Sequence, residues 1–126
     1  MSKHDEISLV QVQKRPGGGS DRTLKKNVMT IHNVLDRVVS LRPVTWNWKS
    51  DKEDRGLQYG FIAQEVEEVF PDLVSENTWN DGSTRKFLST NDMLPYLVGS
   101  IKEQQQQIVE LKKQITKLKL ELSEKE

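Results

Sequence analysis

A serine followed five residues later by a lysine is the feature of this sequence best suited to chemistry. Ser20 begins the segment SDRTLKKN, Lys25 is its sixth residue, and three glycines at 17–19 precede it. A serine hydroxyl is a weak nucleophile until a base accepts its proton, and a neutral lysine amine can act as that base. The pair is chemically sufficient for attack on a carbonyl.

The spacing of this pair restricts the backbone that could bring the two side chains together. Five positions along a helix separate side chains by about 140°, and an odd spacing along a strand puts them on opposite faces. A turn at Ser20 that leads into TLKKN would join them. Without further information we favour a plainer interpretation, in which Ser20 or Asp21 caps a helical turn and Lys25 is solvated. Lys26 is a rival candidate for the base.

Composition limits the classes of function. The chain has 126 residues, of which 34% are hydrophobic and 30% charged, so the core of a compact monomer would be thin. Lys and Arg balance Asp and Glu at 19 each, which argues against a nucleic-acid partner. There are no cysteines and only two histidines, so we predict no metal site and no cofactor. The apolar runs are too short for a bilayer or a signal peptide, so we expect no membrane partner and folding in a cytoplasm.

The pattern along the chain predicts three parts. Residues 1–19 contain a strand at 7–13, which resembles the end of something upstream, and a glycine-rich junction. Residues 20–90 form a small α+β domain, with a helix that Thr30 caps and Pro43 ends. The remaining elements of that domain are strands at VTWNWK and QYGFIA, a helix at AQEVEEVF, and a hairpin of LVSE and RKFLST around the turn NDG.

The third part, residues 91–126, has a seven-residue repeat that predicts a long helix in a parallel coiled coil. This seam consists of Leu94, Ile101, Ile108, Ile115 and Leu122, with Leu97, Gln104, Leu111 and Leu118 three positions later. The β-branched isoleucines, with leucines three positions later, by themselves favour a coiled coil of two helices. Gln104 is a candidate for a polar layer that sets the register. The alternative is a helix that lies against its own domain.

Several motifs in this order resemble one family. SDRTLKKN, LRPVTWNWK, GFIAQEVEEVFPDLV and LPYLVGSIKEQQQQI look like the intramolecular chaperone auto-processing domain of phage endosialidase tail spikes and tail fibres, over about residues 20–114. The resemblance implies a homotrimer that helps an upstream β-rich passenger of the same polypeptide to fold, in the host cytoplasm during virion assembly. It also implies release from the mature fibre by self-cleavage.

Carried over residue by residue, the resemblance makes Ser20 the nucleophile and Lys25 its partner, with a scissile bond between Gly19 and Ser20. Asp21 and Asn27 occupy motif positions without an assigned role. A base must be neutral, whereas an ordinary lysine with a pKa of about 10.4 is neutral in roughly one molecule in a few thousand at pH 7. Burial on trimer assembly, or the nearby cations of Arg22 and Lys26, would have to raise the neutral fraction.

Two other functions stay open. One is a trimerisation and folding domain with the same fold that does not cleave itself. The other is the similar self-cleaving domain of membrane-tethered transcription factors, which predicts a DNA-binding region upstream and a membrane helix downstream. We favour the phage fibre because the glycine-rich junction and the short strand fit the end of a fibre.

Overall fold

The computed structural model describes residues 19–50 and 55–125. The strand predicted at 7–13 lies outside these residues. The chain divides between Thr30 and Ile31 into two compact units, and each is considered by itself below. Within the described residues, no helix combines the length and the apolar character that crossing a membrane requires.

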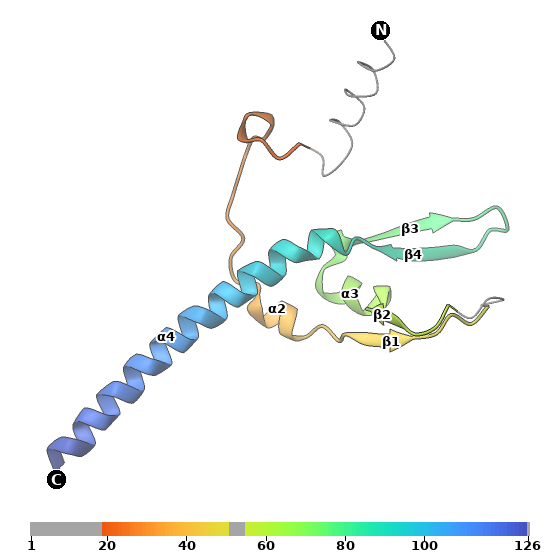
Figure 1. Cartoon of the computed structure of the whole chain (residues 1–126). Helices are drawn as coiled ribbons and strands as arrows, with labels where there is room; N and C mark the ends of the chain where they lie inside the picture. Colours follow the sequence, from red (N-terminus) through yellow and green to blue (C-terminus); the bar gives the residue numbers. More distant parts are fainter. Residues whose placement is uncertain (1–18, 51–54, 126) are drawn as a thin grey trace, which may run out of the picture. The chain divides into compact units, whose positions relative to one another are not determined.

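The second unit mixes short helices and strands with one long helix, as the sequence predicts (Figure 1). Its last helix, α4, has 32 residues. In chain order the elements are α2 (Leu35–Val39), β1 (Val44–Trp46), β2 (Gln58–Gly60), α3 (Ala63–Val69), the 3₁₀ turn η2 (Pro71–Leu73), β3 (Val74–Thr78), β4 (Thr84–Leu88), the 3₁₀ turn η3 (Asn91–Met93) and α4 (Leu94–Lys125).

Two separate antiparallel hairpins provide all the strands of the described residues. The first pairs β1 with β2, and the second pairs β3 with β4 from Val74 opposite Leu88 to Thr78 opposite Thr84. The turn of the second hairpin includes Gly82 at φ 85°, a left-handed conformation that glycine adopts without steric cost. The predicted hairpin around NDG is thereby confirmed.

The helix predicted to begin after Thr30 is shorter than expected. It begins only at Leu35, and Thr30 does not cap it. The physical reason is that Asn33 takes a left-handed conformation, with φ 58°, and interrupts the helical backbone before the first turn. Val34 and Leu35 are nevertheless buried, whereas Ile31 is exposed, so the apolar periodicity identified the buried positions from Val34 onwards but placed the start of the helix too early.

The core of the second unit lies where α3 and η2 meet the start of α4. Its buried members are Val66, Phe70, Leu73 and Met93. The Arg37 guanidinium lies 4.2 Å from the centre of the Phe70 ring and donates a hydrogen bond to the Val69 carbonyl, 2.8 Å away. A cation over an aromatic face is attracted by the ring quadrupole, so Arg37 links α2 to the end of α3.

The Glu103 carboxylate of α4 replaces the missing cap of α2. Its Oε1 accepts from the Val34 amide at 3.0 Å and its Oε2 from the Leu35 amide at 2.9 Å. These amides have no partner within α2, and no side chain of the N-cap residue satisfies them. A Cβ added at Gly99 would come 3.2 Å from Val34 Cγ2, so the glycine lets α2 approach α4 closely.

Removing the Glu103 carboxylate should loosen α2 from α4. We expect Glu103→Ala to lower the melting temperature, because two amides lose their acceptor. The two amides, Val34 first, lower the pKa of this carboxyl. Its contribution should therefore be complete above the usual pKa of glutamate and be lost as pH falls through the lowered value.

Thermal melts between pH 7 and pH 3 measure this effect. Glu110→Ala removes an exposed glutamate of the same helix and is the matched control. Equal melting temperatures for the two variants at pH 7 would show that the Glu103 cap does not stabilise the fold.

Candidate active site

The structure brings the serine and the lysine of the SDRTLKKN segment into direct contact. Lys25 Nζ donates a hydrogen bond to Ser20 Oγ over 2.7 Å. This separation lies within the range expected for a nucleophile and its base. The plainer interpretation of the sequence, in which Lys25 is only solvated, does not describe this arrangement.

A single 3₁₀ turn, η1 (Arg22–Leu24), makes the contact possible. The Leu24 amide donates to the Asp21 carbonyl at 3.0 Å, and the Lys25 amide donates to the Arg22 carbonyl at 3.1 Å. The backbone thus doubles back over five residues, which neither a regular helix nor a strand would do. The turn that the sequence requires at Ser20 is present.

Asp21 is the N-cap of this turn, so one half of the plainer interpretation holds. Its Oδ1 accepts from the Thr23 amide and from the Thr23 hydroxyl, each at 2.9 Å. These two hydrogen bonds, the amide first, lower the pKa of the Asp21 carboxyl. Ser20 contributes its hydroxyl to the contact with Lys25 instead of capping the turn.

The amides of the turn already have acceptors. The Thr23 amide is bound by the Asp21 side chain, and the Leu24 and Lys25 amides are bound by backbone carbonyls. An oxyanion is stabilised by donors that point at it and are not otherwise engaged. In this conformation the three amides therefore cannot supply an oxyanion site.

The glycine before Ser20 lies beneath a leucine side chain. A Cβ added at Gly19 would come 2.5 Å from Leu24 Cδ1, closer than two carbon atoms can pack. Any larger residue at position 19 would push the Leu24 side chain away. Leu24 is largely exposed, so its side chain can move away at little cost, and the contact alone does not require glycine at this position.

The other two motif positions have different surroundings. Asn27 adopts φ 55°, a left-handed conformation that asparagine tolerates better than most residues, so it redirects the chain after the lysine pair. Lys26, the rival base, has no hydrogen bond or ion pair with any residue in the described part of the chain.

Ser20 and Lys25 are both exposed to solvent in the single chain. The lysine acts as the hydrogen-bond donor in this contact, as an ammonium group does. To act as a base it must lose that proton, and the serine hydroxyl then becomes the donor to the amine. Lys25 Nζ and Ser20 Oγ are already at the hydrogen-bond distance that this exchange of donor and acceptor needs.

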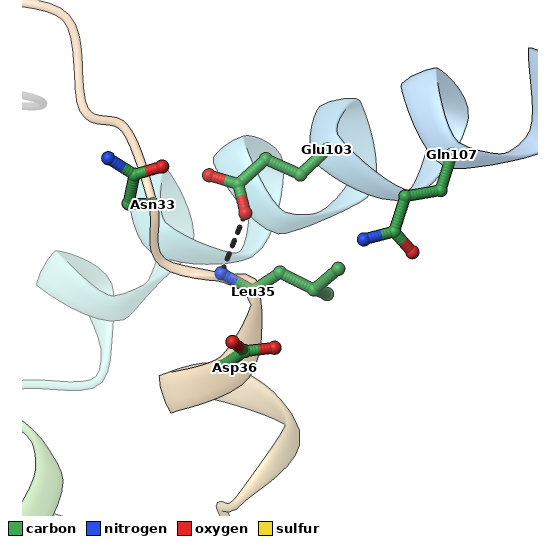
Figure 2. Close-up of a pocket in the computed structure, with 5 residues that line it drawn as sticks. All are labelled: Asn33, Leu35, Asp36, Glu103 and Gln107. Carbon is green, nitrogen blue, oxygen red and sulfur yellow. Dashed lines mark hydrogen bonds between the residues drawn. The ribbon is translucent and has the colours of Figure 1, made fainter. Parts of the chain in front are cut away.

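A pocket in the second unit offers no comparable pair. Figure 2 shows it at the start of α2, lined by Asn33, Leu35, Asp36, Glu103 and Gln107. Both oxygens of the Glu103 carboxylate already accept backbone hydrogen bonds there. No group of three or more His, Cys, Asp or Glu side chains that could hold a metal ion gathers among residues 19–50 and 55–125.

Comparison with protein-family models gives a match over part of the chain. Residues 20–75 match the model of the Peptidase_S74 family, described as chaperone of endosialidase. The match begins at Ser20 and ends within β3, so it is shorter than the resemblance over residues 20–114 that the motifs suggest. A search of curated proteins found no match to this chain.

Proposed function

We propose that residues 20–75 form an endosialidase-type intramolecular chaperone domain, as the family match supports, and that the chain trimerises, assists an upstream fibre to fold and then cuts itself off. The family implies association with a passenger that precedes the domain. The passenger in this proposal is a β-rich phage tail fibre or spike of the same polypeptide. Folding and cleavage then take place in the host cytoplasm during virion assembly.

The observation that carries the proposal is the 2.7 Å contact between Ser20 Oγ and Lys25 Nζ. The contact lies at the first residue of the family match, where the glycine-rich junction ends. A domain that cuts itself from the segment before it needs a nucleophile and a base at that boundary. The name of the family, which places it among the peptidases, supports the same chemistry.

The proposed reaction uses the atoms of this turn. Ser20 Oγ attacks the Gly19 carbonyl carbon while its proton passes to Lys25 Nζ. The bond between the Gly19 carbonyl carbon and the Ser20 nitrogen then breaks, and the nitrogen takes a proton and becomes a free amine. Water cleaves the resulting ester of Gly19 on Ser20 Oγ and regenerates the hydroxyl. Direct attack by water on the same bond is the alternative route.

The exposed seam of α4 supports assembly. The isoleucines and leucines of the seam from Ile108 onwards are each 45–64% exposed in the single chain. A second stripe of α4, formed by Tyr96, Gly99, Ser100 and Glu103, contacts the rest of its own unit. The centres of the two stripes are roughly 90–110° apart around the helix, and the second stripe ends at Glu103, so the seam from Ile108 onwards can pair with other copies while the domain stays attached.

Trimer formation would also account for the timing of the cut. Lys25 is exposed in the single chain, and burial of a lysine favours the neutral amine that a base requires. We infer that packing of three chains buries the pair and thereby activates Lys25. Cleavage would then follow assembly instead of preceding it.

A coiled coil suits the folding role. Fibres built from non-local strand pairs fold slowly and expose unpaired edges meanwhile. Three chains joined at their ends meet at high effective concentration and in a common register. Removing the coil afterwards leaves the fibre protected by its barrier to unfolding.

Replacing the nucleophile tests the cleavage. We expect Ser20→Ala to stop cleavage entirely, because no other group is placed against Lys25 within the described turn. Chains with an upstream fibre passenger, analysed by denaturing gel, should be cut for the wild type and whole for the variant. Native fibre from both would separate folding from cutting, and a cut in Ser20→Ala would exclude Ser20 as nucleophile.

The exposure of the pair favours a second candidate function, a trimerising and folding domain that does not cut itself. In that case the lysine stays charged and donates to the serine permanently. The wild type would then remain whole after folding its passenger, and Ser20→Ala would be indistinguishable from it.

A further inference from the structure

The contact between Ser20 and Lys25 depends on a turn that has little else to hold it. No residue of η1 is buried, so apolar packing does not fix its conformation. One 3₁₀ turn closed by two backbone hydrogen bonds is marginal in water. The lysine side chain is long and flexible, so its amine stays near the serine only if the backbone returns it there.

The Asp21 side chain supplies the additional constraint. Its Oδ1 holds both the amide and the hydroxyl of Thr23, the middle residue of η1. A carboxylate forms stronger hydrogen bonds to backbone amides than a neutral acceptor does. Asp21 has no hydrogen bond or ion pair with Ser20 or Lys25, so any effect on them passes through the backbone of the turn.

We propose that Asp21 is a positioning residue for self-cleavage, because its cap on the turn holds Lys25 Nζ against Ser20 Oγ. This inference rests on the proposed function. It assigns the aspartate no proton transfer and no contact with the scissile bond. The carboxyl is ionised at neutral pH, since the Thr23 amide and hydroxyl lower its pKa, so it has no proton to give.

Three variants separate capping from charge. Asp21→Ala removes the acceptor, and we expect cleavage to slow by about 10-fold to 100-fold through misplacement of Lys25. Asp21→Asn keeps an oxygen that can accept from Thr23, and we expect a rate within about 3-fold of wild type. Thr23→Val keeps the amide and the branched shape but loses the hydroxyl, so its rate should fall between the two.

The pH profile supplies a readout that loss of folding would not reproduce. Between pH 6 and pH 9 the cleavage rate should follow the same profile in wild type and Asp21→Asn, because the Asp21 carboxyl, whose pKa is lowered, does not change its charge in that range. An aspartate that acts through its charge would instead make Asp21→Asn as slow as Asp21→Ala and would shift the profile. Either result would overturn the positioning role.

A second measurement does not depend on cleavage. At pH 6, where a lysine base is more fully protonated and the reaction is slower, NMR can detect the proximity of the Lys25 ε-protons to the Ser20 β-protons. We expect this cross-peak in wild type and Asp21→Asn, and its loss in Asp21→Ala. A cross-peak retained in Asp21→Ala would contradict the inference.

The two measurements keep the two proposals apart. A wild type that never cleaves but shows the expected cross-peak pattern would remove the proposed function and leave the role of Asp21 in the turn intact. A wild type that cleaves at the same rate as Asp21→Ala would do the reverse. Circular dichroism of each variant checks that the second unit remains folded.

Discussion

Lys25→Met should reduce the rate of self-cleavage by at least about 100-fold, the usual contribution of a general base. Methionine keeps most of the length and the apolar stem of lysine but has no amine to accept the serine proton. The contact of Lys25 Nζ with Ser20 Oγ at 2.7 Å is the reason to expect so large an effect. First-order rate constants from gel densitometry of an assembled, purified sample measure it.

Lys26→Met is the matched control, because the two lysines are adjacent and both exposed. Lys26 makes no contact with Ser20 in the described turn, so its loss should change the rate by no more than a few-fold. A large loss of rate in Lys26→Met, with Lys25→Met close to wild type, would assign the base to Lys26.

Charges placed in the seam of α4 should abolish both assembly and cleavage. Each isoleucine that a coiled coil buries contributes about 1.5–3 kcal/mol, and an aspartate in its place would have to be buried as a charge. In Ile108→Asp with Ile115→Asp, every chain of a trimer carries two such charges. Sedimentation should then give a monomer, and the chain should remain whole.

Positions one residue further along the helix provide the control for this variant. Val109→Asp with Thr116→Asp makes a similar change of polarity on exposed residues outside the seam. This variant should still assemble and cleave. A sedimentation-verified monomer of the seam variant that cleaves at the normal rate would separate cleavage from assembly.

The sequence predicted those parts of the fold that local patterns control. The hairpin around Gly82 and the helix before Pro71 follow from turn residues and from a residue that ends helices, and both are confirmed. The start of α2 was placed wrongly because its cap is Glu103, which lies 68 residues from Leu35 along the chain. A periodic pattern contains no information about such a distant acceptor.

In the candidate site, too, local features could be predicted from the sequence and side-chain packing could not. The spacing of Ser20 and Lys25 correctly required a turn, and Asp21 was correctly included among the capping candidates. The two interpretations of the sequence proved compatible in part, because the turn that Asp21 caps is the same turn in which Lys25 contacts Ser20. The packing of Leu24 over Gly19 could not be predicted, since it depends on the turn that the cap creates.

The sequence contains little indication that Glu103 caps the start of α2. Gly99 and Ser100 are small residues on the face of α4 beside the seam, where a neighbouring element can approach closely. Glu103 follows them at helical spacing on that face. Neither feature indicates which segment packs there, because that depends on the folded path of residues 31–93.

The most direct test of self-cleavage between Gly19 and Ser20 is the intact mass of freshly prepared wild-type protein, followed over time. We predict two products that appear together, residues 1–19 and a fragment that begins at Ser20, while the Ser20→Ala and Lys25→Ala chains stay whole over the same period. A wild-type chain that stays whole, or a cut at any other bond, would contradict self-cleavage between Gly19 and Ser20.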